Sequence, residues 1–383
     1  MLLFLKSKER LKRSGFYRGD TTMHPFALRR SIATALIAVC GAAFVPSAFA
    51  DDLADFYKGK QMRMIIRSGP GGGYDQYARL LAKHIGKHIP GTPSTIPINT
   101  PGGGGITAAN NVAFTLPKDG TILTIASQGL PMDQALGLNP SFKADLRTFN
   151  WIGNMSDSNQ VLVTWHTSPT KTLDDAFKRE TLIGVTGAGS ISTMIPAAMN
   201  TVIGTKFRII AGYPDGPDVN LAMERGEVEG RGTNPYASYV SATPAYVRDH
   251  LINMLVQVGA KKDPAIPNVP LLSDYAKTDE QKQILDFFSK AVSVGRPIAT
   301  SPEVPMERVT ALRRAFDATL KDPEFVADAK KQNAEISPMT GEVLQQLIDD
   351  MIGAPPTVLE KVKAAIQAKK GIELKPGAKE DGE

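Results

Sequence analysis

The sequence predicts an α/β fold with parallel β-sheets, divided into two domains. Two observations support this prediction. Four times, an apolar strand-like run leads through a glycine-containing turn into a helical pattern, which is typical of α/β domains. After an export signal of 50 residues, 333 of the 383 residues remain, enough for two domains of ordinary size. Parallel sheets of this kind place their ligand sites at the carboxyl ends of the strands, where these turns are expected.

The N-terminus has the three regions of a secretory signal. Arg29 and Arg30 precede an apolar run that ends at the small-residue segment Ala48-Phe49-Ala50. The apolar run is too short to span a bilayer. We therefore expect cleavage after Ala50 and a periplasmic protein. Met23 opens this signal naturally, so a true start at Met1 or at Met23, and export by the general or the twin-arginine route, both stay open.

All of the excess positive charge belongs to the export signal. The first 50 residues hold eight Lys or Arg and two Asp or Glu, which leaves 36 basic against 37 acidic residues afterwards. No basic face for a nucleic acid is expected. The only cysteine, Cys40, leaves with the signal, so disulfides and thiol chemistry are excluded for the exported chain.

The first strand–turn–helix unit carries the clearest candidate site. The strand 62–66 leads into the turn Gly69–Asp75, and the stripe Tyr77, Leu80, Leu81, His84 and Ile85 follows at helical spacing. A turn with few side chains lets several N–H groups converge before a helix N-terminus, where the macrodipole favours an anion. The alternative is that these glycines only permit the positive φ angles of a tight turn.

The other units repeat this arrangement, and the repetition favours the anion-site interpretation. The second turn is Pro101–Gly105, and the third is Gly187–Ser190, after the strand 182–186. The fourth is Gly212–Pro217, after the strand 207–210. Backbone N–H groups are the expected donors, because no matching cationic cluster accompanies the turns.

Two further segments complete the expected organisation. The strand 121–126 ends at Ser127 and Gln128, which places these residues at the same edge. Extended segments near 150–163 and 292–299 are interpreted as the crossings between the two domains.

The sequence lacks the motifs of the common enzyme classes that we considered. A dinucleotide fingerprint needs a third glycine where the first turn has Tyr74 and the third turn has Ser192. His84 and His88 are four residues apart on a helix, but Ile85 replaces the glutamate of a zinc protease. We expect neither a metal nor a cofactor. Asp75 and Asp215 stand at helix starts and serve either as ordinary first-turn residues or as acceptors for a ligand.

The order of these motifs resembles a known family. The first turn continues into Ala78-Arg79, the second stretch reads Asn99–Gly105, and a Pro117–Gly120 turn follows. Together they look like the Bug family, the periplasmic solute receptors of tripartite tricarboxylate transporters, over nearly all of the exported chain. Three segments depart from the family pattern: Ser68-Gly69, Ala108, and Tyr213-Pro214-Asp215-Gly216, which lacks the usual lysine.

The resemblance implies a two-lobed type II periplasmic binding protein fold with a central ligand cleft. Lobe 1 would comprise 51–152 and 295–383, with a disordered tail at 370–383, and lobe 2 would comprise 153–294. The expected ligand-binding residues come from all four turns and from two strand ends. They are Gly69, Gly71, Gly72, Gly73, Tyr74, Asp75, Gly102, Gly103, Gly104, Gly105, Ser127, Gln128, Gly187, Gly189, Ser190, Ser192, Thr193, Tyr213, Asp215 and Asn234.

The expected function is capture of a small organic carboxylate, either a di- or tricarboxylate or an aromatic acid. The expected partners are the membrane subunits of a tripartite tricarboxylate-type transporter. The receptor is expected to be a monomer, and we do not expect it to be an enzyme. The alternatives are an exported α/β enzyme for a small anionic substrate and a receptor that reports its ligand to a signalling partner.

Overall fold

The computed structural model describes residues 47–187, 190–367 and 371–375. The chain divides after Ala48, and the fold below is that of the unit Phe49–Glu383. The signal residues Arg29, Arg30 and Cys40, and the alternative start Met23, lie outside the described residues. Helix α1 (Ser47–Tyr57) contains the expected cleavage site.

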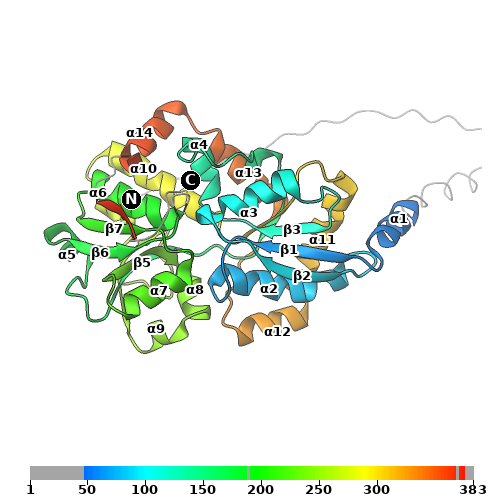
Figure 1. The fold of residues 1–383 in the computed structure, drawn as a ribbon, viewed down its shortest axis with the longest axis horizontal. Coiled ribbons are helices and arrows are strands. Elements are labelled where there is room, and N and C mark those ends of the chain that lie inside the picture. Colours follow the sequence, from blue (N-terminus) through cyan, green and yellow to red (C-terminus); the bar gives the residue numbers. More distant parts are fainter. Residues whose placement is uncertain (1–46, 188–189, 368–370, 376–383) are drawn as a thin grey trace, which may run out of the picture. The chain divides into compact units, whose positions relative to one another are not determined.

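Two six-stranded sheets organise this unit (Figure 1). In the first sheet, β1 pairs in parallel with β2 and β3, whereas β10 pairs antiparallel with β3 and β4, and β11 with β4. The strands in spatial order are β11 (Met339–Thr340), β4 (Asn150–Asn154), β10 (Pro297–Thr300), β3 (Ile122–Ile125), β1 (Gln61–Ile66) and β2 (Ser94–Asn99).

The second sheet has a similar mixed arrangement. Its strand β6 pairs in parallel with β7 and β8, β12 pairs in parallel with β7, and β5 pairs antiparallel with β8 and β9. The spatial order is β12 (Ile372–Leu374), β7 (Phe207–Ala211), β6 (Thr181–Gly184), β8 (Gly230–Pro235), β5 (Gln160–Trp165) and β9 (Ile252–Val258).

Helices cover both sheets, and the alternation of side chains explains how. In β1, Met64 and Ile66 join one buried cluster with α2, while Ile65 joins another with α3, because successive strand residues point to opposite faces. The helices near the first sheet are α2 (Gly73–Ile85), α3 (Ile106–Asn110), α4 (Leu130–Leu136), α11 (Met306–Lys321), α12 (Pro323–Lys331) and α13 (Gly341–Ile352). Those near the second are α5 (Leu173–Lys178), α6 (Ile191–Val202), α7 (Gly216–Glu224), α8 (Tyr236–Ser241), α9 (Pro244–Arg248), α10 (Asp279–Val292) and α14 (Pro356–Gln367).

The chain passes between the sheets three times. It leaves the first sheet after β4, returns between α10 and β10, and leaves again after α13, because α14 packs on α6 and α10 and β12 pairs with β7. The sequence suggests only the first two passages. It also suggests a disordered tail from residue 370, whereas Ile372–Leu374 form the edge strand β12, held partly by two hydrogen bonds from Arg208 to Glu373.

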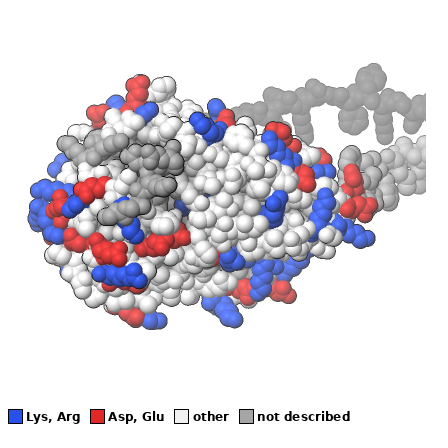
Figure 2. Space-filling model, in the orientation of Figure 1, with Lys and Arg blue, Asp and Glu red and all other residues white. Residues whose placement is uncertain are grey.

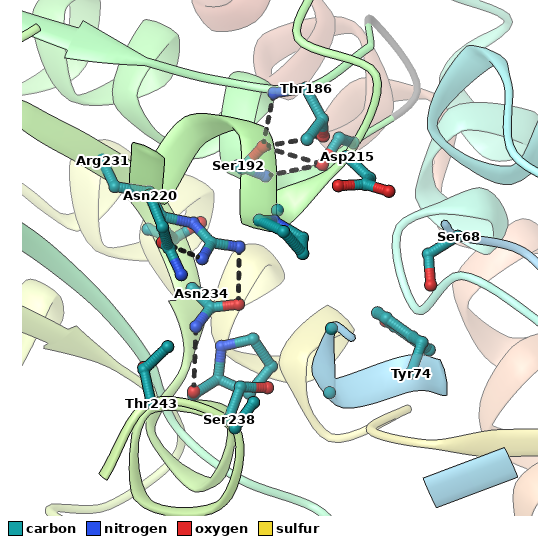
Figure 3. Close-up of a pocket in the computed structure, with 18 of the residues that line it drawn as sticks. Ser68, Tyr74, Thr186, Ser192, Asp215, Asn220, Arg231, Asn234, Ser238 and Thr243 are labelled. Atoms are coloured by element: carbon teal, nitrogen blue, oxygen red, sulfur yellow. Dashed lines mark hydrogen bonds between the residues drawn. The ribbon is translucent and has the colours of Figure 1, made fainter. Parts of the chain in front are cut away.

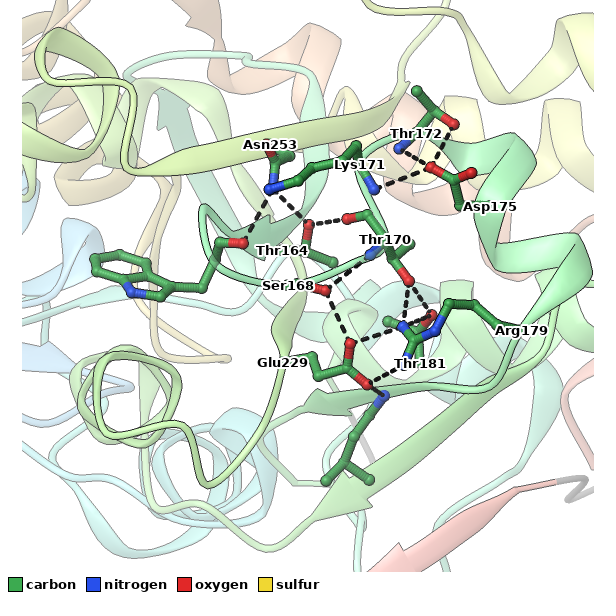
Figure 4. Close-up of polar contacts among 12 residues, drawn as sticks. Thr164, Ser168, Thr170, Lys171, Thr172, Asp175, Arg179, Thr181, Glu229 and Asn253 are labelled. Atoms are coloured by element: carbon green, nitrogen blue, oxygen red, sulfur yellow. Dashed lines mark hydrogen bonds and ion pairs between the residues drawn. The ribbon is translucent and has the colours of Figure 1, made fainter.

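A polar cluster joins the start of β6 to the end of the β7–β8 connection (Figure 4). Arg179 donates to both carboxylate oxygens of Glu229 at 2.7 and 3.0 Å, and Ser168 donates to the same carboxylate at 2.8 Å. The buried hydroxyl groups of Thr170 and Thr181 lie 2.7 Å apart beside it. This cluster lies at the amino ends of β6 and β8, whereas the glycine turns follow the carboxyl ends of strands.

Candidate ligand-binding site

A pocket of about 330 Å³ is lined by residues of both sheets. The first sheet contributes residues that follow β1 and β3, and the second contributes residues after β6 and β7 and around the end of β8. The pocket therefore lies at carboxyl ends of parallel strands, where α/β folds bind their ligands.

Half of the residues expected in the site line this pocket. Those that do are Gly71, Gly72, Gly73, Tyr74, Ser127, Gln128, Ser190, Ser192, Asp215 and Asn234. Those outside the lining are Gly69, Asp75, Gly102, Gly103, Gly104, Gly105, Gly187, Thr193 and Tyr213. Gly189 lies outside the described residues.

Asp75 holds the first turn in shape from outside the pocket. Its carboxylate accepts hydrogen bonds from the Gly71 amide at 2.9 Å, from Arg79 Nε at 2.8 Å and from Asn99 Nδ2 at 2.8 Å. Burial alone raises the pKa of Asp75, but these bonds lower the pKa below its usual value overall. Its acceptor sites are occupied by groups of the turn and its neighbours. This fits the interpretation of Asp75 as an ordinary first-turn residue.

The second glycine turn packs against the third. Gly102, Gly103, Gly104 and Gly105 all have φ between +54° and +137°, a backbone path that other residues rarely adopt. A Cβ atom on Gly187 would lie 2.8 Å from the Gly104 nitrogen, so the two turns are in backbone contact. The glycines here serve a tight turn and a close approach between the sheets.

Two arginines contact the ring of Tyr74. The guanidinium carbon of Arg67 lies 4.7 Å from the ring centre, and that of Arg296 lies 4.5 Å from it. The Tyr74 hydroxyl accepts from the Gln128 amide at 3.3 Å. Arg296 is only 2 % exposed, and its Nη2 donates to Ser238 Oγ at 2.5 Å, which connects a residue beside β10 to α8 of the second sheet.

Arg231 is positioned by two amide side chains (Figure 3). Its Nη1 donates to Asn220 Oδ1 at 2.6 Å, and its Nη2 donates to Asn234 Oδ1 at 2.9 Å. Burial lowers the pKa of Arg231 and of Arg67, because it disfavours the charged form. Among the described residues, neither arginine lies within 4 Å of a carboxylate, and the same is true of Arg296.

The third turn supplies hydroxyl groups at the start of α6. Ser190 Oγ accepts from the Ser192 amide at 3.2 Å and lies 2.8 Å from Ser192 Oγ, which in turn lies 3.2 Å from Thr186 Oγ1. Ser190 is therefore the N-cap of α6 and a pocket residue at once. Thr193 donates to the Gly187 carbonyl at 3.1 Å, which explains its place outside the lining.

Asp215 precedes α7 and is 9 % exposed. Burial and the neighbouring Asp218 raise its pKa to about 6. Figure 3 draws its carboxylate across the open space from Ser68 and Tyr74. Tyr213, two residues earlier, is buried in the core of the second sheet.

Several buried polar atoms around the pocket have no hydrogen-bond partner within the described chain. They are Arg67 Nε, Ser68 Oγ, Gln128 Oε1 and both amide atoms of Gln160. Buried polar groups are normally satisfied, so this wall is suited to a ligand that carries polar groups or brings water.

The expectation that no cationic cluster accompanies the turns is wrong. Arg67 lies directly after β1, Arg231 lies in β8, and Arg296 directly precedes β10, so they are far apart in sequence and meet only in the fold. The position of Arg67 at the carboxyl end of a parallel strand was the one signal that could have identified it.

Charged side chains of both signs are intermixed on the face drawn in Figure 2, as the balanced composition suggests. Within residues 47–187, 190–367 and 371–375, no group of His, Cys, Asp and Glu residues is arranged to hold a metal ion. In the same part of the chain, no helix is long and apolar enough to cross a membrane.

The fold matches solved periplasmic binding proteins. The structure of BugD is 19 % identical, with a TM-score of 0.64 over 83 % of this chain and all of the other. A protein of R. palustris with bound adipate is 19 % identical, with a TM-score of 0.63 over 79 % and 97 % of the chains. MatC from Rhodopseudomonas palustris with bound malate is 18 % identical, with a TM-score of 0.62 over 79 % and 99 %.

These likenesses confirm the two-lobed α/β fold, with each sheet and its helices forming one lobe. No curated protein matches the sequence. The sequence model of the tripartite tricarboxylate transporter family receptor, TctC, matches residues 77–367, which is most of the chain. The chain belongs to this family of solute-binding receptors.

Proposed function

We propose that the protein binds a small organic carboxylate in the pocket between its lobes. The observation that carries the proposal is the pair Arg67 and Arg231, which face one pocket from the two sheets and have no carboxylate of the described residues in ion-pair contact. A partly buried guanidinium without an ion partner is costly, and a bound carboxylate would offset that cost with paired hydrogen bonds.

Other donors around the pocket suit the same ligand. The start of α6 offers the hydroxyl groups of Ser190 and Ser192 together with backbone N–H groups. Gly72 and Gly73 offer backbone N–H groups at the start of α2 on the opposite wall. Adipate and malate, the ligands in two similar folds, are both carboxylates and support this choice.

The receptor would deliver its ligand, unchanged, to the membrane subunits of a tripartite tricarboxylate-type transporter. Family membership supports this role, and we propose a monomer that retains one ligand per chain without turnover. Cleavage after Ala50 would release a periplasmic chain that begins at Asp51, two residues after the start of the main unit. N-terminal sequencing of the exported protein would test the cleavage.

Mass spectrometry of the natively purified protein would identify the ligand, and calorimetry would give its affinity. We expect Arg231→Met to weaken binding about ten- to a hundred-fold, because hydrogen bonds to charged groups contribute roughly 1.5–3 kcal/mol each. The control is Arg208→Met, since Arg208 lies on the same sheet but pairs with Glu373 at its edge. Unchanged affinity in a folded Arg231→Met protein, or turnover of the ligand, would contradict the proposal.

A further inference from the structure

The carboxylate of Asp215 lies at the seam between the two lobes. Asp215 lines the pocket, and a Cβ atom built on Gly69 would lie only 1.8 Å from Asp215 Oδ2. The carboxylate of the second lobe therefore sits against the first-lobe backbone at Gly69. In this arrangement an acceptor is brought to the seam between the lobes (Figure 3).

The charges around Asp215 limit what can face it. Arg67 and Arg231 line the same pocket and are the natural partners of a ligand carboxylate. A second carboxylate placed beside Asp215 would bring two like charges together, which is unfavourable. A ligand ammonium group would face Asp215 but would also lie in the field of two guanidinium groups.

A neutral hydrogen-bond donor on the ligand is compatible with Asp215 and with both arginines. Its O–H can donate to Asp215 without adding charge, while the ligand carboxylate remains with the arginines. Resting on the proposed function, we infer that Asp215 selects organic carboxylates that carry a hydroxyl group, and that this hydroxyl donates to the Asp215 carboxylate. Asp215 is thus a specificity-determining residue, separate from the residues that hold the carboxylate.

The test uses pairs of acids that differ by one hydroxyl group: malate and succinate, citrate and tricarballylate, mandelate and phenylacetate. Aspartate, with an ammonium group in place of the malate hydroxyl, is the charged comparison. Calorimetry on the exported chain near pH 8, where the Asp215 side chain is mainly ionised, gives the affinity ratio within each pair. The variants are Asp215→Ala and Asp215→Asn, and the control is Asp174→Asn, an exposed carboxylate in the first turn of α5 outside the pocket lining.

In the pair that binds, we expect the hydroxy acid to bind at least tenfold more tightly than its partner, and aspartate to bind less tightly than malate. Asp215→Ala should reduce the ratio below about threefold, mainly through weaker binding of the hydroxy acid, and Asp215→Asn should give an intermediate ratio. Asp174→Asn should retain the full ratio.

Equal affinities within every pair that binds, or a ratio that persists in Asp215→Ala, would overturn the role of Asp215 but leave carboxylate binding intact. Aspartate binding as tightly as malate would overturn the choice of a hydroxyl group. If no acid binds to folded protein, the proposed function fails, and the inference fails with it.

Discussion

Single residues at the seam between the lobes decide how closely the two sheets approach. A Cβ atom on Gly73 would lie 2.3 Å from Ser238 Oγ of the opposite lobe, and 3.0 Å from Nη2 of Arg296, which donates to that hydroxyl group. Gly73→Ala should therefore keep the fold of each lobe but hinder the closed arrangement. We expect weaker ligand binding and a larger radius of gyration in the presence of ligand, measured by calorimetry and small-angle scattering.

The adjacent Gly72 provides a matched control. A Cβ atom there would lie 3.5 Å from Pro217 Cδ, which is an ordinary van der Waals contact, and its φ of −88° suits any residue. Gly72→Ala should bind its ligand nearly as the parent protein does. Equal losses in both variants would show that the first turn, rather than the seam, is sensitive to substitution.

Asp133 is a buried acid whose effect on stability depends on pH. It is 1 % exposed, its two carboxylate oxygens have no hydrogen-bond partner within the described chain, and burial raises its pKa from 3.8 to about 6. Between these two values the folded protein keeps a proton that the unfolded chain loses, so stability falls as the pH rises through this window. The full penalty above pH 6 is on the order of 3 kcal/mol.

Asp133→Asn should therefore raise the free energy of unfolding near pH 8 and change it little near pH 4. Denaturant unfolding at both pH values measures this difference. An equal change at the two values would mean that the substitution acts through packing and not through ionisation.

At the scale of elements, the start of α6 combines a cap with a binding surface. Ser190→Ala removes the acceptor for the Ser192 amide and should lower the free energy of unfolding by about 1 kcal/mol. The same substitution should weaken ligand binding, because Ser190 also lines the pocket.

Thr278→Ala serves as the comparison for this element. Thr278 caps α10 by accepting from the Gln281 amide at 3.2 Å and does not line the pocket. It should lose similar stability in thermal unfolding and keep full affinity in calorimetry. Full affinity in Ser190→Ala as well would assign that residue to capping alone.

The strand–turn–helix units could be predicted from sequence because each rests on local signals: β1, β3, β6 and β7 and the helices α2, α6 and α7 lie where the apolar patterns and glycine turns indicate. The two arginines of the pocket, Arg67 and Arg231, and the nearby Arg296 could not be predicted, because they meet only through long-range pairing of strands. The second turn lies outside the pocket lining. Its four glycines permit positive φ angles and a close backbone contact with Gly187. A glycine-rich turn of this kind has the same sequence pattern as an anion-binding turn.

For the whole molecule, we expect closure of the lobes around the ligand through the segments after β4 and before β10. Only a few residues of these connections need to change φ and ψ, so secondary structure should persist while the radius of gyration falls. Small-angle scattering with and without saturating ligand measures this change. Ligand should also raise the melting temperature, because it binds the folded state. An identical scattering profile despite confirmed binding would leave a preformed pocket instead.

The third passage of the chain limits how far such a movement can go. Helix α14 packs on α6 and α10 of the second lobe and also contacts α4 of the first, and one continuous apolar core includes residues of all four helices. Opening the pocket cannot separate this side of the molecule without exposing that core to water. Helix α14 should therefore keep its contacts with both lobes during closure, and the lobes should rotate relative to each other about this helix through a small angle. A variant truncated before Pro356 lacks this helix. We expect its lobes to open more widely and its ligand to exchange faster.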